Sequence, residues 1–158
     1  MQNSRPLART LLLSLATGLR STSGIAALSR DASTGRHPLG AGPLRQLAIP
    51  GVATALTLAQ AGEVVADKLP FLPNRTESAS LAGRMALGAL IGILILRSRH
   101  KDPWPAAALD AGVAGVATFA AVRLRVFLTG RGVPNPVAGL LEDGVVVALL
   151  RAASTQDA

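Results

Sequence analysis

Residues 78–97, SASLAGRMALGALIGILILR, form an almost uninterrupted apolar run that decides the fold class. About 20 such residues in one helix cross the roughly 30 Å hydrocarbon core of a bilayer. Within the run, Gly88 and Gly92 form a GxxxG pair, a spacing that lets the backbone of a neighbouring helix approach closely. A generic small-residue face in a chain rich in Ala and Gly is the alternative interpretation of this pair.

Four more apolar segments flank this run, separated by loops rich in Gly, Pro and polar residues. We therefore expect an all-α fold, an integral membrane helical bundle of about five transmembrane helices in a single domain over residues 1–158. Pro50 either kinks the second helix or marks its true first turn. The five helices are expected at about 7–28, 44–69, 78–97, 104–127 and 136–152.

The composition fits helices in lipid better than a soluble core. Hydrophobic residues make up 49% of the chain but aromatic residues only 3%, and a soluble core of this size uses more aromatic bulk. The net charge of +7 comes from Lys and Arg scattered at the ends of apolar runs, without an aromatic platform for bases. We therefore expect no nucleic-acid partner. With no cysteine, disulfides and thiolate metal ligands are excluded.

The N-terminal segment has two interpretations. Arg5 and Arg9 before the apolar run at 11–16, with small residues at 26–29, resemble a secretory signal peptide. We expect a first membrane helix instead, because four apolar segments follow and need no separate export signal. If five helices cross in turn, the basic residues divide almost evenly between the two sides and predict no orientation. One side would hold Arg5, Arg9, Lys68, Arg75, Arg125 and Arg131, and the other Arg30, Arg36, Arg45, Arg97, Arg99, Lys101 and Arg151.

Two acidic pairs lie inside predicted membrane helices, where each ionised group costs roughly 2.5–3.5 kcal/mol on insertion. Glu63 and Asp67 are four residues apart and share one helical face. Carboxylates at this depth suit a small cation or a proton, whereas Asp67 is close enough to a helix end to be solvated there. Glu63, about one turn deeper, is the stronger candidate for an ion or proton site.

The second pair, Glu142 and Asp143, consists of adjacent residues, so their side chains diverge by about 100° and cannot face the same partner. Arg20 and Arg84 lie at similar depth and are the candidate counter-ions, for instance Arg84 or Arg20 for Glu142. Such ion pairs would remove most of the cost of burying the charges. Asp110 is near a helix start, where a carboxylate suits the helix dipole.

No enzyme motif is present in the sequence. His37 and His100 lie in predicted loops without a second ligand at zinc spacing. Nucleophile elbows, phosphate-binding glycine loops and dinucleotide fingerprints are missing. We expect neither an enzyme nor a cofactor, and the identity of any metal is left open.

Several short motifs, taken in order along the chain, resemble those of a family of bacterial membrane proteins, the domain of unknown function DUF4126. The resemblance spans about residues 12–153. It implies a multi-helix membrane protein with no established activity, whose embedded charges belong to one shared architecture. The motifs are Gly18-Leu19-Arg20-Ser21, Ala27-Leu28-Ser29, Glu63-Val64-Val65-Ala66-Asp67-Lys68-Leu69-Pro70, Gly83-Arg84, and Asn135 followed by Leu141-Glu142-Asp143.

Two functions compete on this evidence. The first is a small transporter or channel for a cation or protons that uses buried carboxylates. The alternative is a non-transporting membrane scaffold or accessory subunit whose buried charges are structural ion pairs. In either case we expect the lipid bilayer as a partner and a bacterial plasma membrane as the location, with a monomer and a homo-oligomer both open. The candidate ion site comprises Glu63, Asp67, Glu142 and Asp143, with Arg20 and Arg84 as counter-ions.

Overall fold

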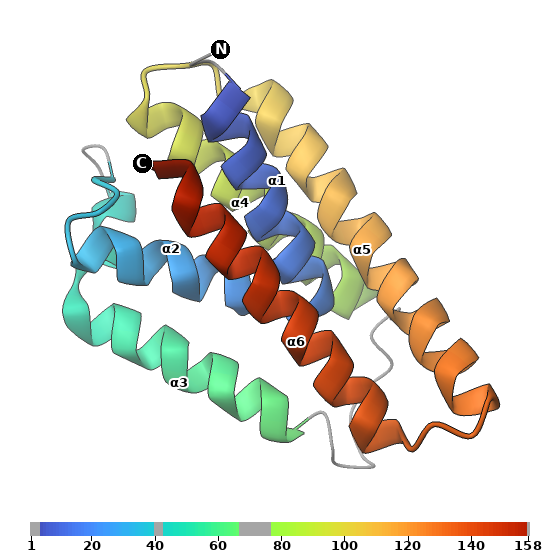
Figure 1. Cartoon of the computed structure of the whole chain (residues 1–158). Coiled ribbons are helices and arrows are strands. Elements are labelled where there is room, and N and C mark those ends of the chain that lie inside the picture. Colours follow the sequence, from blue (N-terminus) through green and yellow to red (C-terminus); the bar gives the residue numbers. More distant parts are fainter. Residues whose placement is uncertain (1–3, 40–42, 67–76, 158) are drawn as a thin grey trace.

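The computed structural model describes residues 4–39, 43–66 and 77–157, and every regular element in these ranges is helical (Figure 1). The all-α prediction is therefore confirmed. The helices are α1 (Ser4–Leu19), α2 (Ser23–Ser33), α3 (Pro50–Ala66), α4 (Ser78–Ser98), α5 (Trp104–Gly130) and α6 (Asn135–Ser154), with short 3-10 helices η1 (Pro43–Ala48) and η2 (Thr155–Asp157).

Prolines mark where three of the helices begin. α3 starts at Pro50, so this proline sets the first turn and does not kink the second predicted segment. Pro105 and Pro136 lie in the first turns of α5 and α6, where the missing amide hydrogen costs no intrahelical hydrogen bond. The bounds of α4, α5 and α6 match the predicted segments within a few residues. The end of the second predicted segment lies outside the described residues.

The single helix predicted over 7–28 is wrong. The chain turns back at Arg20–Thr22, so that α1 and α2 form a helical hairpin whose two helices diverge from the turn (Figure 1). Hydroxyl side chains at the turn compete with helical hydrogen bonding. Ser23 Oγ lies 2.8 Å from the carbonyl oxygens of Ala16 and Arg20. This hydroxyl thus bonds to carbonyl oxygens that accept hydrogen bonds from backbone amides in a continuous helix.

Small residues let the two helices of the hairpin approach each other and their neighbours. A Cβ on Gly24 would overlap Thr17 Oγ1 and would lie 2.5 Å from the carbonyl oxygen of Leu13. A Cβ on Gly18 would overlap the backbone of Ala114 on α5. Glycine at these positions is therefore a requirement of close packing and not of backbone conformation.

α1 lies at the centre of the bundle and packs against α2, α4, α5 and α6. α5 runs parallel to α1, whereas α4 and α6 run antiparallel to it, and α3 packs on α2 at the edge (Figure 1). The start of α1 and the C-terminal ends of α4 and α6 lie at one end of the molecule, and we call this the termini end (Figure 1). Ser98 Oγ of α4 is 3.2 Å from Nε2 of His37, which places the segment after α2 at the same end.

The predicted GxxxG pair packs α4 against α5. A Cβ on Gly88 would lie 2.6 Å from the carbonyl oxygen of Asp110, and one on Gly92 would lie 2.5 Å from a carboxylate oxygen of the same residue. These positions therefore admit no side chain unless α5 moves, and the close-contact interpretation of the pair is confirmed. Gly83, by contrast, has open space where its Cβ would lie.

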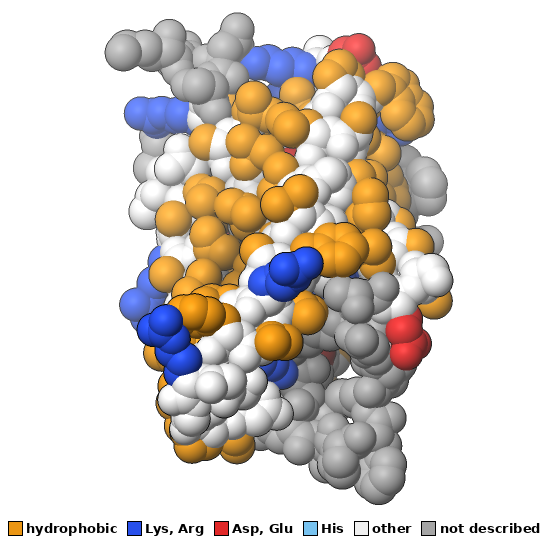
Figure 2. Space-filling model, turned by 90° about the vertical axis from the view of Figure 1, so that its right-hand side faces the viewer, with side chains coloured by type: hydrophobic (Ala, Val, Ile, Leu, Met, Phe, Trp, Pro, Cys, Tyr) orange, Lys and Arg blue, Asp and Glu red, His pale blue; other side chains and the backbone are white. Residues whose placement is uncertain are grey.

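Apolar side chains cover much of the outside of the bundle, while polar side chains occupy much of its inside. Figure 2 shows a mainly apolar face on the side where α5 lies. Among the described residues, α4 and α5 are the two helices long and apolar enough to cross a membrane, where about five were predicted. In the most apolar window of each, 33% and 28% of the residues are buried in the protein, and the others are partly or fully exposed. Exposed apolar residues include Val116, Phe119, Val126, Leu140 and Val147, whereas buried polar ones include Arg9, Thr17, Arg20, Arg84, Asp110 and Glu142.

Replacing Gly88 or Gly92 by Ala should separate α4 from α5 and lower the free energy of unfolding by about 1–3 kcal/mol, the usual cost of overpacking. Gly83→Ala is the matched control, because its Cβ enters open space and Ala favours a helix by roughly 0.5–1 kcal/mol over Gly. Thermal unfolding in detergent, followed by circular dichroism, measures all three variants. Equal stability of the three would contradict the close packing.

Candidate functional site

Four charged side chains from distant parts of the chain meet at the turn between α1 and α2. Arg20 belongs to the turn itself, Glu63 comes from α3, Arg84 from α4 and Asp143 from α6. We call these four residues the turn cluster. The turn leaves carbonyl oxygens at the end of α1 and amide hydrogens at the start of α2 without partners in their own helices. The turn cluster supplies those partners.

Glu63 caps the start of α2. Its Oε1 accepts hydrogen bonds from the backbone N and Oγ of Ser21, both at 2.8 Å. Its Oε2 accepts from the backbone N of Thr22 at 3.1 Å and from Oγ1 at 2.9 Å. Thr22 is the N-cap residue of α2, yet its own side chain makes no capping hydrogen bond. A carboxylate from another helix therefore caps α2, and its negative charge suits the positive end of the helix dipole.

Arg84 serves the opposite pole, at the end of α1. Its Nη1 donates to the carbonyl oxygens of Gly18 at 2.8 Å and Leu19 at 3.2 Å, and its side chain is only 5% exposed. The Thr118 hydroxyl of α5 lies 3.0 Å from the same Gly18 oxygen. Arg84 Nη2 is 3.6 Å from Glu63 Oε1, so the charges that serve the two helix ends also form an ion pair.

The adjacent acids of α6 pair with different arginines, in agreement with their predicted divergence on the helix. Arg20 contacts Asp143 Oδ1 through Nε at 2.8 Å and Nη2 at 2.6 Å, which joins the turn to α6. Glu142, only 4% exposed, forms a 2.5 Å ion pair with Nη2 of Arg125 on α5. The sequence pattern did not identify Arg125 as this partner, because the pairing depends on how α5 packs against α6.

The remaining predicted site residue, Asp67, lies outside the described residues. Within the described ranges, no group of three or more His, Cys, Asp or Glu side chains is arranged to hold a metal ion. The turn cluster contains two arginines and two carboxylates, so its formal charges balance. Its chemistry is that of ion pairs and helix capping.

Asp110 is a buried acid whose surroundings the sequence did not indicate. It lies in the second turn of α5, whose start at Trp104 agrees with the predicted segment, and its side chain is 0% exposed. Neither of its carboxylate oxygens forms a hydrogen bond with a described residue. The hydroxyls of Thr10 and Ser14 on α1 are near enough to interact electrostatically, but without hydrogen-bond geometry. The local pattern could not reveal this setting, because its neighbours come from α1 and from Gly92 of α4.

A second group of charges lies at the termini end. Arg9, 1% exposed, forms a 2.7 Å ion pair with Asp31 and so joins α1 to α2. His37 is buried beside this pair and close to Ser98. Burial, followed by the positive charges of Arg9 and Arg99, lowers the pKa of His37 to about 4, while Asp31 opposes the shift. The imidazole is therefore neutral at pH 7.

Comparison with known families gives one assignment. A family model described as a domain of unknown function (DUF4126) matches residues 7–156. The chain belongs to this family. The resemblance seen in the short motifs is confirmed, and the whole turn cluster of this DUF4126 chain lies within the matched residues. Comparisons with curated proteins and with solved structures find no match.

Acid should destabilise the DUF4126 chain through His37. The unfolded chain takes up a proton on His37 below the ordinary pKa of 6.5, whereas the folded protein resists protonation down to about pH 4. The stability that the neutral ring contributes is thus fully present above pH 6.5 and is lost as the pH falls toward 4. The loss is about 2 kcal/mol once solvent screening is allowed for.

The measurement is thermal unfolding of wild type and His37→Gln, from about pH 8 down to about pH 4. Gln is neutral at every pH, so the variant should lack this part of the acid sensitivity. Identical pH profiles for the two proteins would show that His37 is not the group that titrates.

Proposed function

We propose that this DUF4126 chain is an integral membrane protein that acts as a non-transporting scaffold, in which buried charges hold the α1–α2 hairpin inside the bilayer. The observation that carries the proposal is the bonding of Glu63 and Arg84, since each charge already serves the end of a helix. This favours structural ion pairs over cation or proton transport by Glu63 and Glu142.

The distribution of polarity supports a location in the membrane. Most residues in the apolar windows of α4 and α5 are partly or fully exposed, whereas a core helix of a soluble protein is mostly buried. α1 has 16 residues and is therefore about 24 Å long, shorter than the roughly 30 Å hydrocarbon core. The turn after α1 would lie within the bilayer, where irregular backbone is tolerated only if protein buries it and satisfies its hydrogen bonds.

Glu63 has little capacity left for a transported cation. An ionised carboxylate has about four lone-pair sites, and Glu63 already receives four hydrogen bonds, two at each oxygen. Arg84 adds a positive charge 3.6 Å away, which repels a second cation. An entering cation would have to displace the donors that begin α2, and each buried N–H left without a partner costs about 1–3 kcal/mol.

The hairpin also changes where the basic residues lie. Because α2 turns back along α1, Arg5 joins the basic residues of the termini end and does not lie opposite them. The positive-inside rule then favours an orientation with both termini in the cytoplasm of a bacterial cell. Among the described residues outside the turn cluster, the termini end carries Arg5, Arg30, Arg36, Arg45, Arg97, Arg99, Lys101 and Arg151 at or near the surface, against Arg123, Arg125 and Arg131 toward the other end.

Single cysteines test this orientation, because the chain has no cysteine of its own. Thr155→Cys at the termini end and Thr129→Cys near the other end are matched, exposed positions. In intact bacterial cells, a membrane-impermeant maleimide should label Thr129→Cys at once and Thr155→Cys only after permeabilisation. The reverse pattern would contradict the orientation, and labelling of both positions in intact cells would contradict the membrane topology.

Glu63→Gln should destabilise the protein without altering ion flux. Gln keeps the size of Glu but loses its charge and one acceptor oxygen, so we expect a loss of about 2–4 kcal/mol in unfolding free energy. Glu77→Gln is the control: Glu77 is the exposed N-cap residue of α4 and its side chain makes no capping hydrogen bond, so its change should cost no more than about 1 kcal/mol. In liposomes, wild type and both variants should leave cation and proton flux at the level of protein-free vesicles. A wild-type flux that Glu63→Gln abolishes, with insertion unchanged, would overturn the scaffold proposal.

A second candidate function rests on Asp110. Its carboxylate is fully buried without a hydrogen-bond partner in the described residues, next to the hydroxyls of Thr10 and Ser14. Oxygen groups of this kind bind protons and hard cations, so Asp110 is a better candidate for ion transfer than Glu63. The same vesicle assay includes Asp110→Asn. A wild-type flux lost in Asp110→Asn but kept in Glu63→Gln would favour this candidate over the scaffold.

A further inference from the structure

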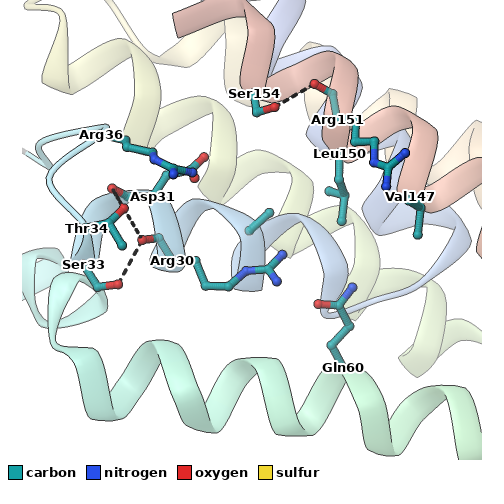
Figure 3. Close-up of a pocket in the computed structure, with 11 residues that line it drawn as sticks. Arg30, Asp31, Ser33, Thr34, Arg36, Gln60, Val147, Leu150, Arg151 and Ser154 are labelled. Carbon is teal, nitrogen blue, oxygen red and sulfur yellow. Dashed lines mark hydrogen bonds between the residues drawn. The ribbon is translucent and has the colours of Figure 1, made fainter.

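A cavity of about 540 Å³ lies between α2, α3 and α6, toward the termini end, and its lining includes no residue of the turn cluster (Figure 3). Arg30 of α2, Arg36 just after α2 and Arg151 of α6 bring three guanidinium groups to its lining. Figure 3 shows Arg30 and Arg151 extending into the space between the helices, with Gln60 of α3 pointing toward them from the other side. The cavity therefore gathers hydrogen-bond donors from three separate helical segments.

The positive charge of this cavity is largely uncompensated. Asp31 is the acid among its lining residues, and its carboxylate is already paired with the buried Arg9 at 2.7 Å. None of the side chains of Arg30, Arg36 and Arg151 forms an ion pair or hydrogen bond with another described residue. An anionic group in the cavity would meet three guanidinium groups that are paired with no acid in the described part of the chain.

The ends of α2 and α6 do not need these guanidinium groups. Arg30 and Arg151 lie in the last turns of their helices, where carbonyl oxygens require donors. Hydroxyl groups supply them: Ser33 and Thr34 donate to the carbonyl oxygen of Arg30 at 2.9 and 3.0 Å, and Ser154 donates to that of Arg151 at 2.7 Å. The two arginine side chains are thus available to bind a ligand.

Apolar side chains form the rest of the wall. Ala27, Val147 and Leu150 line the cavity beside the arginines, and Val147 is 48% exposed on the outer side of α6. Guanidinium groups bind phosphate oxygens through paired hydrogen bonds, and apolar walls suit hydrocarbon chains. Basic pockets between membrane helices on the cytoplasmic side are typical sites for anionic lipid headgroups.

We propose that this cavity binds a phosphate-bearing group, with Arg30 and Arg151 as its principal ligands and Arg36 at its rim. Two sources share this chemistry: the headgroup of an anionic phospholipid in the leaflet at the termini end, and phosphate or a phosphorylated solute from water. The site shares no residue with the turn cluster and goes beyond the scaffold role. Binding of a soluble phosphate does not depend on the membrane location, whereas binding of a lipid headgroup does.

The test uses the full chain in detergent and two probes. One is inorganic phosphate compared with chloride at equal ionic strength, and the other is phosphatidylglycerol compared with phosphatidylcholine in mixed micelles. The rise of the thermal midpoint with probe concentration yields an apparent dissociation constant. We expect at least one phosphate probe to stabilise wild type, and Arg30→Gln with Arg151→Gln to weaken its binding about tenfold or more.

The matched control is the double variant Arg45→Gln with Arg97→Gln, which removes two exposed arginines from the same end of the molecule. It should change the dissociation constant less than about twofold. If the double variant Arg30→Gln with Arg151→Gln fails to fold, the double variant Arg30→Lys with Arg151→Lys replaces it. Lysine keeps the positive charge but cannot form the paired hydrogen bonds of a guanidinium group, so binding should still weaken several-fold.

The pattern of responses distinguishes the two sources. Stabilisation by phosphatidylglycerol alone assigns a lipid headgroup, and stabilisation by inorganic phosphate assigns a soluble ligand, provided that either response depends on Arg30 and Arg151. Three results overturn the proposal: neither probe stabilises wild type, the cavity variants bind as wild type does, or the control variant loses as much affinity as the cavity variants.

Discussion

Helix ends inside a protein must find partners for their free carbonyl and amide groups, and the α1–α2 turn concentrates this demand within residues 18–22. Each helix around the hairpin contributes a side chain that bonds to this turn, so the turn determines how the bundle is assembled. A side chain that moved away would leave part of the turn unsatisfied, which couples four helices to one short stretch of backbone. The partners are Glu63 from α3 for the amides of Ser21 and Thr22 just before α2, Arg84 from α4 and Thr118 from α5 for the Gly18 carbonyl, and Asp143 from α6 for Arg20.

The signs of these charges follow from the helix dipoles. The end of α1 is the negative pole of its helix and binds Arg84, whereas the start of α2 is a positive pole and binds Glu63. Exchanging the two charges would preserve the ion pair but would place each charge at the wrong pole. The separation of 3.6 Å between Arg84 Nη2 and Glu63 Oε1 agrees with a larger role for the helix ends than for the ion pair in positioning the two groups. It exceeds the 2.5 Å between Arg125 and Glu142, because the two helix ends and not mutual attraction position the groups.

Hydropathy and proline positions predict α4, α5 and α6 well, since the limits of these helices are encoded locally. The break at Arg20–Thr22 was missed because apolar residues continue on both sides of it, and its signal was the run of hydroxyl residues between Gly18 and Gly24. The charges of the turn cluster were identified from the sequence because they lie well inside the predicted apolar segments. Their partners could not be predicted, because the pairing with Arg125 and the setting of Asp110 arise only when separate helices pack together.

The hairpin links the interior of the bundle to the cavity at its end. Had the first segment run as one straight helix, Arg9 and Asp31 would have lain about 33 Å apart, 22 residues at 1.5 Å each. The turn instead brings them to 2.7 Å. This pairing neutralises the one acid among the described residues that line the cavity, so that the charges of Arg30, Arg36 and Arg151 dominate it. Loss of the turn would therefore also carry Arg30 and Arg36 away from the cavity, since α2 forms one of its walls.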